Sequence, residues 1–324
     1  MARAFCLSIV LLAVACGAAN SAIAQDYPTR PVRFIVPFPP GGSVDITARV
    51  VGQRLSETFG QQVVIDNRLG AAGIIGTEIA AKALPDGYTV LIGSIGALSI
   101  NPGFYKKLPY NTIKNFAPVT LAAIAPNILV VHPSLPVSSV KELIALAKLK
   151  PGQLNFASGG IGTGNHLAME LFRTMAGIAM VHVPYKGAPL ALTDVISGQI
   201  QIMTPPMPAA VPHVRAGKLK ALAVTSSKRT RAMPDLPTIA EAAVPGYEAD
   251  GWIGVLVPAG TPRRIVEKLN SEIGAILGMP EVAAYLLSQG AVASPTTPEQ
   301  FGAFIKAEIA KWANVIKTAR IRVE

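Results

Sequence analysis

The fold is decided by one stretch, Val32-Arg-Phe-Ile-Val-Pro-Phe-Pro-Pro-Gly-Gly-Ser43. Its first five residues are almost continuously apolar, which is typical of a strand buried on both faces of a parallel sheet. The prolines and glycines that follow predict a tight loop. A helix is then expected from Ser43 to about Thr58. A strand that turns at once into a helix indicates an α/β protein.

The same alternation continues along the chain and divides it into two α/β units. Strands at 62–66 and 88–92, with a helix at 72–83 between them, complete a βαβαβ pattern in the first unit. The second unit is predicted to contain the strands 128–131, 155–157, 180–183, 200–203 and 221–224 and the helices 139–149, 164–176 and 188–196. A strand at 252–257 and helices at 262–277 and from Pro298 follow.

Two α/β units with helices at the C-terminus predict a two-lobed fold of the type II-like periplasmic binding protein class, with a hinge cleft between two α/β domains. Residues 25–123 and 250–324 would form one domain, and residues 124–249 the other. The crossover connections are expected near residues 120–127 and 245–252. Because ligands of open α/β sheets bind beyond the carboxyl ends of the strands, the cleft between the lobes is the expected binding site.

The first 24 residues are predicted to be a cleaved signal peptide. Arg3 supplies a positive start, residues 5–14 are apolar, and Ala22-Ile-Ala24 is a cleavage signature before Gln25. A periplasmic location is therefore expected. Two alternatives stay open, namely an uncleaved membrane anchor and a lipoprotein acylated at Cys16.

Composition excludes several other classes of protein. Half of the chain is apolar and 15% is charged, which favours a folded core over disorder. The only cysteines, Cys6 and Cys16, lie in the predicted signal, so the mature chain would have neither a disulfide nor a thiolate ligand. The net charge is +10, but the basic residues are scattered without an aromatic recognition motif, so no nucleic-acid partner is expected.

The first candidate binding loop joins the first strand to the first helix. Its glycines allow a ligand to approach the backbone, and the N-terminus of the helix behind them favours anions. Capping of the helix by Ser43 or Asp45 is the alternative role. The candidate ligand-binding residues here are Pro40, Gly41, Gly42, Ser43 and Asp45.

The second candidate loop spans residues 155–166 and lies between a strand and a helix of the second unit. Its composition also fits a plain glycine-rich turn. It is a poor dinucleotide motif, because Asn165 stands where the third glycine belongs. Together the two loops would place two helix N-termini across one cleft. The candidates here are Ser158, Gly162, Thr163, Asn165 and His166.

Catalytic and metal chemistry find little support. Ser94 lies in Ile92-Gly-Ser-Ile-Gly96, which lacks the first glycine of a nucleophile elbow. The four histidines have no metal-ligand spacing. We therefore expect no metal, no cofactor and no enzymatic activity, with an exported hydrolase as a distant alternative. Ser94 is kept as a candidate ligand contact, and Lys186 is the one cation expected near the cleft.

The mature chain resembles the Bug-type substrate-binding proteins of tripartite tricarboxylate transporters. The resemblance rests on motifs along its whole length, which are Tyr27-Pro-x-Arg-Pro31, Pro40-Gly-Gly-Ser-x-Asp45, Asn67-Arg68 with Gly70-Ala-Ala-Gly73, Leu84-Pro-Asp-Gly-Tyr88, Gly162-Thr-x-x-His-Leu167 with Glu170, Val183-Pro-Tyr-Lys-Gly187, Gly217-Lys-Leu-x-Ala-Leu-Ala-Val224 and Trp252-x-Gly-x-x-x-Pro-Ala-Gly-Thr-Pro262.

The resemblance implies a binding protein that closes on a small carboxylate and delivers it to an integral-membrane permease. It also implies that backbone amides and two ordered waters near the first loop hold the carboxylate. In the strand after Gly198-Gln199, Gln201 and Pro205 stand where the family often has acids, which argues against an amino-acid ligand. Thr204 in this stretch is a further candidate contact. We expect a monomer, and a sensory binding protein remains the alternative function.

Overall fold

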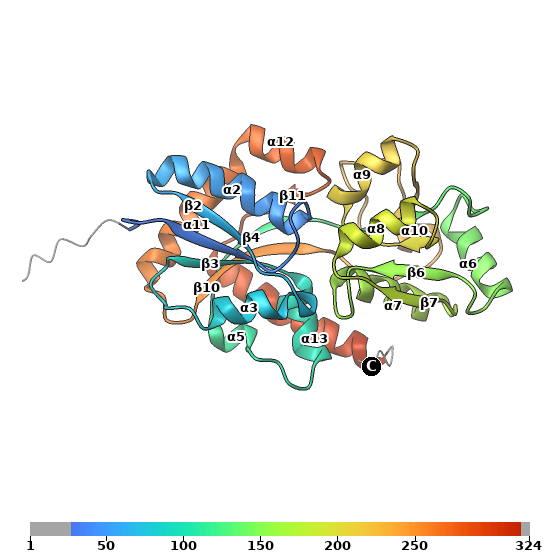
Figure 1. The fold of residues 1–324 in the computed structure, drawn as a ribbon, viewed down its shortest axis with the longest axis horizontal. Helices are drawn as coiled ribbons and strands as arrows, with labels where there is room; N and C mark the ends of the chain where they lie inside the picture. Colours follow the sequence, from blue (N-terminus) through green and yellow to red (C-terminus); the bar gives the residue numbers. More distant parts are fainter. Residues whose placement is uncertain (1–26, 319–324) are drawn as a thin grey trace, which may run out of the picture.

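The computed structural model describes residues 27–318, and Figure 1 shows two lobes that lie next to each other. The predicted signal peptide, its cleavage before Gln25 and Cys16 lie outside the described residues. Between residues 27 and 318, no helix combines the length and the hydropathy needed to cross a bilayer.

The first lobe is built on a six-stranded sheet with the order β11-β4-β10-β3-β1-β2. Strands β1, β2 and β3 are parallel, as the βαβαβ pattern predicts, and β10 runs antiparallel to its neighbours β3 and β4. The strands are β1 (Val32–Val36), β2 (Val63–Asn67), β3 (Thr89–Ser94), β4 (Phe116–Ile124), β10 (Trp252–Pro258) and β11 (Val292–Ala293). The first helices are α2 (Ser43–Phe59) and α3 (Ile74–Ala81), with short helical segments at Ala71–Gly73, Gly96–Ile100, Asn101–Phe104 and Thr112–Asn115.

The second lobe is built on a five-stranded sheet with the order β7-β6-β8-β5-β9. Its strands are β5 (Ile128–Val131), β6 (Asn155–Ser158), β7 (Val181–Pro184), β8 (Ile202–Met203) and β9 (Lys220–Val224). Its helices are α6 (Val140–Leu149), α7 (Gly164–Ala176), α8 (Ala188–Ile196), α9 (Met207–Arg215) and α10 (Ile239–Ala242). Strands β6, β7 and β8 are parallel, so α7 and α8 both begin at the carboxyl ends of strands.

The chain crosses between the lobes twice, and the two crossings run alongside each other. The first lies between β4 and β5, and the second between β9 and β10. The Ala125 amide donates to the Gly251 carbonyl at 2.8 Å, which ties the crossings together. The chain then ends on the first lobe with α11 (Arg263–Gly278), α12 (Pro280–Ser288) and α13 (Pro298–Thr318), drawn in orange and red in Figure 1.

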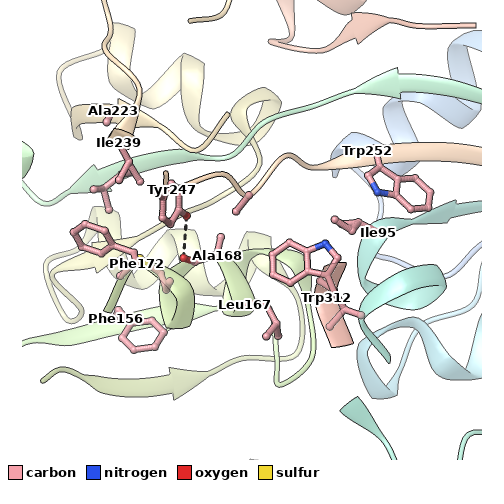
Figure 2. Packing of buried hydrophobic residues seen from close by; sticks show 14 of the residues in the cluster. Ile95, Phe156, Leu167, Ala168, Phe172, Ala223, Ile239, Tyr247, Trp252 and Trp312 are labelled. Carbon is pink, nitrogen blue, oxygen red and sulfur yellow. Dashed lines mark hydrogen bonds between the residues drawn. The ribbon is translucent and has the colours of Figure 1, made fainter. Parts of the chain in front are cut away.

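Polar groups fasten the second crossing at both of its ends. The Tyr247 hydroxyl donates to the Ala168 carbonyl of α7 at 2.9 Å, as Figure 2 shows. At the other end the indole N–H groups of Trp252 and Trp312 donate to the same Glu308 oxygen at 3.1 and 3.2 Å. The crossing is therefore anchored to α7 in one lobe and to α13 in the other.

Helix α9 and strand β4 were not predicted from the sequence, because both contain prolines. Helix α9 carries Pro208 in its first turn and Pro212 in its interior, and no helix was expected there. Strand β4 contains Pro118, which argues against a central strand. Helix α12 was also missed, whereas the bounds predicted for α7 and α8 and the start of α13 at Pro298 are confirmed.

Gly254 in β10 provides a test of packing in the first lobe. A Cβ atom there would lie 2.0 Å from Cζ of the buried Phe301, so Gly254→Ala should lower the free energy of unfolding by about 1–3 kcal/mol. Gly274→Ala in α11 is the matched control, because its Cβ meets no atom within 4 Å and it should gain about 0.5–1 kcal/mol. Urea denaturation measures both, and equal effects would contradict this account of β10.

Candidate functional site

A pocket of about 740 Å³, including its open mouth, lies between the lobes. The first lobe and the crossings contribute Phe38, Pro39, Gly42, Ser43, Val44, Ser94, Ile95, Ala125, Asn127, Gly251, Trp252 and Ile253. The second lobe contributes Gly159, Thr163, Gly164, Asn165, Gly187, Ala188, Pro189 and Pro206. Both candidate loops therefore face one cavity, and the loop before α8 joins them.

Three helices begin at this pocket with their first-turn amides unprotected by side chains. The residues before α2, α7 and α8 are Gly42, Thr163 and Gly187, and none of them caps its helix with a side-chain hydrogen bond. The first amides of a helix have no partner inside it and point outward from its end. The pocket is thus supplied with backbone N–H donors from both lobes.

The pocket carries positive potential without a positive side chain. All twenty residues that line it, each within the described part of the chain, are uncharged. Each helix N-terminus contributes roughly half a positive charge, so the three ends together carry about 1.5. Such a site attracts an anion while avoiding the desolvation of a buried lysine or arginine.

Asp45 holds the first loop in place from behind. Its Oδ2 accepts from the Gly41 amide at 2.9 Å and from Arg49 Nε at 2.8 Å. Asn67 Nδ2 donates to Asp45 Oδ1 at 2.9 Å and to the Phe38 carbonyl at 3.0 Å. Burial alone would raise the pKa of Asp45, but the hydrogen bonds from Arg49, Gly41 and Asn67 outweigh it and lower the pKa. Asp45 therefore stays ionised and shapes the loop without lining the pocket.

Asn165 lines the pocket and carries an unused hydrogen-bond donor. Its Oδ1 accepts from Thr163 Oγ1 at 2.6 Å, and the Thr163 hydroxyl also lies 2.6 Å from the Gly160 carbonyl. Nδ2 of Asn165 is buried without a hydrogen-bond partner, and Asn165 is only 6% exposed. A buried N–H group without an acceptor is costly, so a ligand oxygen at this position would recover that free energy.

Two neutral imidazoles support the second loop from below. His166 and His182 stack with their ring centroids 4.1 Å apart. Nδ1 of His166 accepts from the Gly162 amide at 3.3 Å, and His182 Nε2 lies 2.6 Å from Ser158 Oγ. Burial lowers the pKa of His166 to about 3 and that of His182 to about 4, with nearby positive charge acting in the same direction. The Ser158–His182 pair lies outside the pocket lining, so it acts on the loop's conformation.

The residues proposed from the sequence thus take two kinds of position. Those that line the pocket are Gly42, Ser43, Ser94, Thr163 and Asn165. Those that lie behind or beside it are Pro40, Gly41, Asp45, Ser158, Gly162, His166, Lys186 and Thr204. Lys186 is exposed next to Gly187, and the Thr204 hydroxyl donates to the Asn165 carbonyl at 2.9 Å.

Sequence reasoning missed the third helix end and, apart from Ser94, the hinge side of the pocket. Helix α8 was expected with its observed bounds, and Gly187 two residues before Pro189 was an available signal for its N-terminus. Asn127 and Trp252 had no such signal, because only the folded crossings bring them to the pocket. Within the described residues, no group of three His, Cys, Asp or Glu side chains is placed to hold a metal ion.

The histidine stack predicts how the stability of the protein depends on pH. In the unfolded chain both imidazoles take up protons near pH 6.5, whereas in the folded protein they resist protonation down to about pH 4 and about pH 3. The stability that comes from keeping these two imidazoles neutral is therefore complete above pH 6.5. It is lost, and the free energy of unfolding falls, as the pH drops toward 4. Asp250 has the opposite effect on the free energy of unfolding. Burial, followed by the charge of Glu248, raises the pKa of Asp250 to about 6, so the folded protein binds this proton more readily than the unfolded chain does.

Urea denaturation between pH 5 and 6.5 should show the unfolding free energy falling with a net slope nearer one proton than two. The variant Asp250→Asn should steepen this slope, and His182→Gln should flatten it. Imidazole NMR signals of His166 and His182 that titrate near pH 6.5 in the folded protein would contradict this account.

Comparisons with known proteins agree with the geometry of the site. Residues 47–321 match the tripartite tricarboxylate transporter family receptor. The chain is 39% identical over 318 residues to the protein BugT of Bordetella pertussis, covering 98% of this chain and 97% of BugT.

Two solved structures of similar proteins contain dicarboxylates. The Rhodopseudomonas palustris protein Rpa4515 with adipate has a TM-score of 0.89 and 42% identity, covering 92% of this chain and 99% of that one. MatC from the same organism, with bound malate, has a TM-score of 0.85 and 32% identity, covering 90% of this chain and all of that one. The chain therefore belongs to the tripartite tricarboxylate transporter receptor family, also known as the Bug family, and is a periplasmic solute-binding protein, not an enzyme.

Proposed function

We propose that the pocket captures a small organic carboxylate and that the protein delivers it to the integral-membrane permease of a tripartite transporter. One observation carries the proposal. The pocket-lining residue Asn165 has a buried, unpartnered Nδ2, at a site where three uncapped helix N-termini meet and no side chain of the lining is charged. The carboxylates held by Rpa4515 and MatC support the same ligand class.

A carboxylate matches this donor set better than a neutral solute does. Amides at helix ends form stronger, charge-assisted hydrogen bonds with an ionised oxygen than with a neutral one. The partial charge of the three helix ends, about 1.5 in total, is enough to balance one carboxylate. A neutral polyol would satisfy the amides but would gain nothing from this potential.

The way the protein reaches its ligand is part of the proposal. Residues 1–24 would direct export and be removed, so that the mature chain starts at Gln25 and works as a periplasmic monomer. Sequencing the N-terminus of the periplasmic protein tests the cleavage site, and an intact leader or an acylated Cys16 would refute it.

A ligand panel tests the capture of carboxylates. Adipate and malate should raise the melting temperature and bind in isothermal titration, whereas 1,6-hexanediol, the neutral counterpart of adipate, should do neither. At a hundredfold excess over Kd the stabilisation amounts to about 2.7 kcal/mol. The proposal fails if no small carboxylate binds, or if the diol binds as tightly as the acids.

Gly42→Val tests the role of the backbone amides with little risk to the fold. Gly42 has φ −80° and ψ 167°, which valine adopts freely, and a Cβ there would approach only the Pro39 carbonyl oxygen, at 3.5 Å. The valine side chain should block the approach to α2 and weaken carboxylate binding by about a hundredfold or more. Lys186→Ala, at the exposed edge, should stay within about threefold of the parent protein. If only Lys186→Ala lost binding, an ion pair would carry recognition instead.

We also propose that the ligand closes two moving lobes, residues 25–123 with 250–324 and residues 124–249. In the present arrangement the lobes touch through glycines. A Cβ at Gly96 would lie 3.3 Å from the Gly164 amide nitrogen, and one at Gly187 would lie 2.8 Å from Pro39 Cγ. Small-angle scattering should show the parent protein contracting with ligand, whereas Gly96→Val should stay more extended at saturation. Identical profiles for the two saturated proteins would contradict closure through these contacts.

A further inference from the structure

The pocket has two chemically different ends. At the first end, the loop end, Pro39 and Gly42 of the first lobe lie close to Gly187 and the start of α8. At the other end, the hinge end, the lining comes from the two crossings and from the strands beside them, through Asn127, Gly251, Trp252, Ile253 and Ser94. Ser94 belongs to this end because it pairs with Ile253 across β3 and β10.

We propose that the hinge end accepts an uncharged polar group at the far end of the ligand, and that Asn127 is the residue that determines this specificity. The ligand would then be a monoanion, with one carboxylate at the loop end and an amide, carbonyl or hydroxyl at the hinge end. This inference rests on the proposed function, because it assigns the second end of the same ligand.

Asn127 is fixed in place while its side chain remains free to bind. Its backbone amide donates to Thr225 Oγ1 at 3.0 Å, and its carbonyl accepts from the Thr225 amide at 3.0 Å. The residue is 5% exposed and lines the pocket, yet its carboxamide forms no hydrogen bond with any residue in the described range 27–318. A ligand group that both donates and accepts would satisfy this carboxamide.

The neighbouring helix end offers no compensation for a second carboxylate. Helix α9 starts beside Asn127, since Asn127 and Pro206 form a β-bridge. The Met207 amide already donates to the Pro126 carbonyl at 3.1 Å, Pro208 has no N–H, and the Ala209 amide donates to the Pro206 carbonyl at 3.0 Å. The first-turn donors of α9 are therefore all used or missing, whereas α8 lacks only the amide that Pro189 cannot supply, and α2 and α7 have no proline in their first turns.

The charges near the hinge end also disfavour an anion. Asp250 directly precedes the lining residue Gly251, and its Oδ1 is buried without a hydrogen-bond partner. Lys311, the cation of this region, is held by Glu248 at 2.6 Å and lies 3.7 Å from Glu308. A second carboxylate would be desolvated at the hinge end close to these acids, whereas a neutral amide or hydroxyl carries no such cost.

Three acids with one six-carbon chain test the assignment, namely adipamate, adipate and hexanoate, which end in an amide, a carboxylate and a methyl group. Isothermal titration should show adipamate binding at least about tenfold more tightly than the other two. In Asn127→Leu the preference of adipamate over hexanoate should disappear, while hexanoate stays within about threefold of its affinity for the parent protein. Retained hexanoate binding shows that the variant is folded. If the ligand panel described above shows that the pocket prefers an acid with a different number of carbon atoms, the amide, dicarboxylate and methyl-ended acids of that chain length are used instead.

The possible results separate this inference from the proposed function. If adipate binds most tightly and loses affinity in Asn127→Leu, the hinge end binds a second carboxylate and the inference is wrong. If Asn127→Leu weakens the binding of all three acids equally, or of none of them, Asn127 does not recognise the far end of the ligand. If no carboxylate binds the parent protein, the proposed function fails and the inference fails with it.

Discussion

Unprotected amides at the N-termini of α2, α7 and α8 are the constraint around which the binding site is arranged. None of these ends is capped by a side chain, although Thr163 occupies the N-cap position of α7 and Asp45 lies in the first turn of α2. Asp45 bonds to the Gly41 amide outside the helix instead of capping it. Donors that are left open at both faces of a cavity require an acceptor, and a carboxylate supplies one to both lobes at once.

Most polar residues near the pocket prepare the backbone for this role. Asp45 and Asn67 fix the first loop, while Ser158, His166 and His182 fix the second. They do so from behind the pocket surface, and the residues that line it remain uncharged. Charged and titratable groups thereby set the shape of the site while the potential inside it comes from the peptide dipoles. Such a site keeps its charge over the range in which an imidazole or a carboxylate would titrate.

The sequence was most informative where function depends on local chain geometry. Residues 32–58 and 155–176 each show the pattern of a strand followed by a glycine-rich loop and a helix. The two main loops and the α/β architecture could therefore be predicted. The positions of side chains relative to the pocket could not. Asp45 and Ser43 are two residues apart, yet one faces the loop and the other the cavity, because consecutive helical positions point in different directions. Asn127 and Trp252 are distant in the sequence and meet only because Ala125 and Gly251 bond across the crossings.

The crossings combine two roles that are separate elsewhere in the molecule. They join lobes that meet at Gly96 and Gly187, and their residues Ala125, Asn127 and Gly251 also form the pocket's inner wall. A ligand that reaches this wall therefore contacts the segments that would bend in the lobe motion proposed above. Trp252, at the end of the second crossing, donates to Glu308 of α13, so the wall on the first-lobe side is attached to that helix. A ligand's affinity and its ability to stabilise the closed lobes should consequently depend on the same far-end contacts, because only a domain arrangement that completes those contacts gains their free energy.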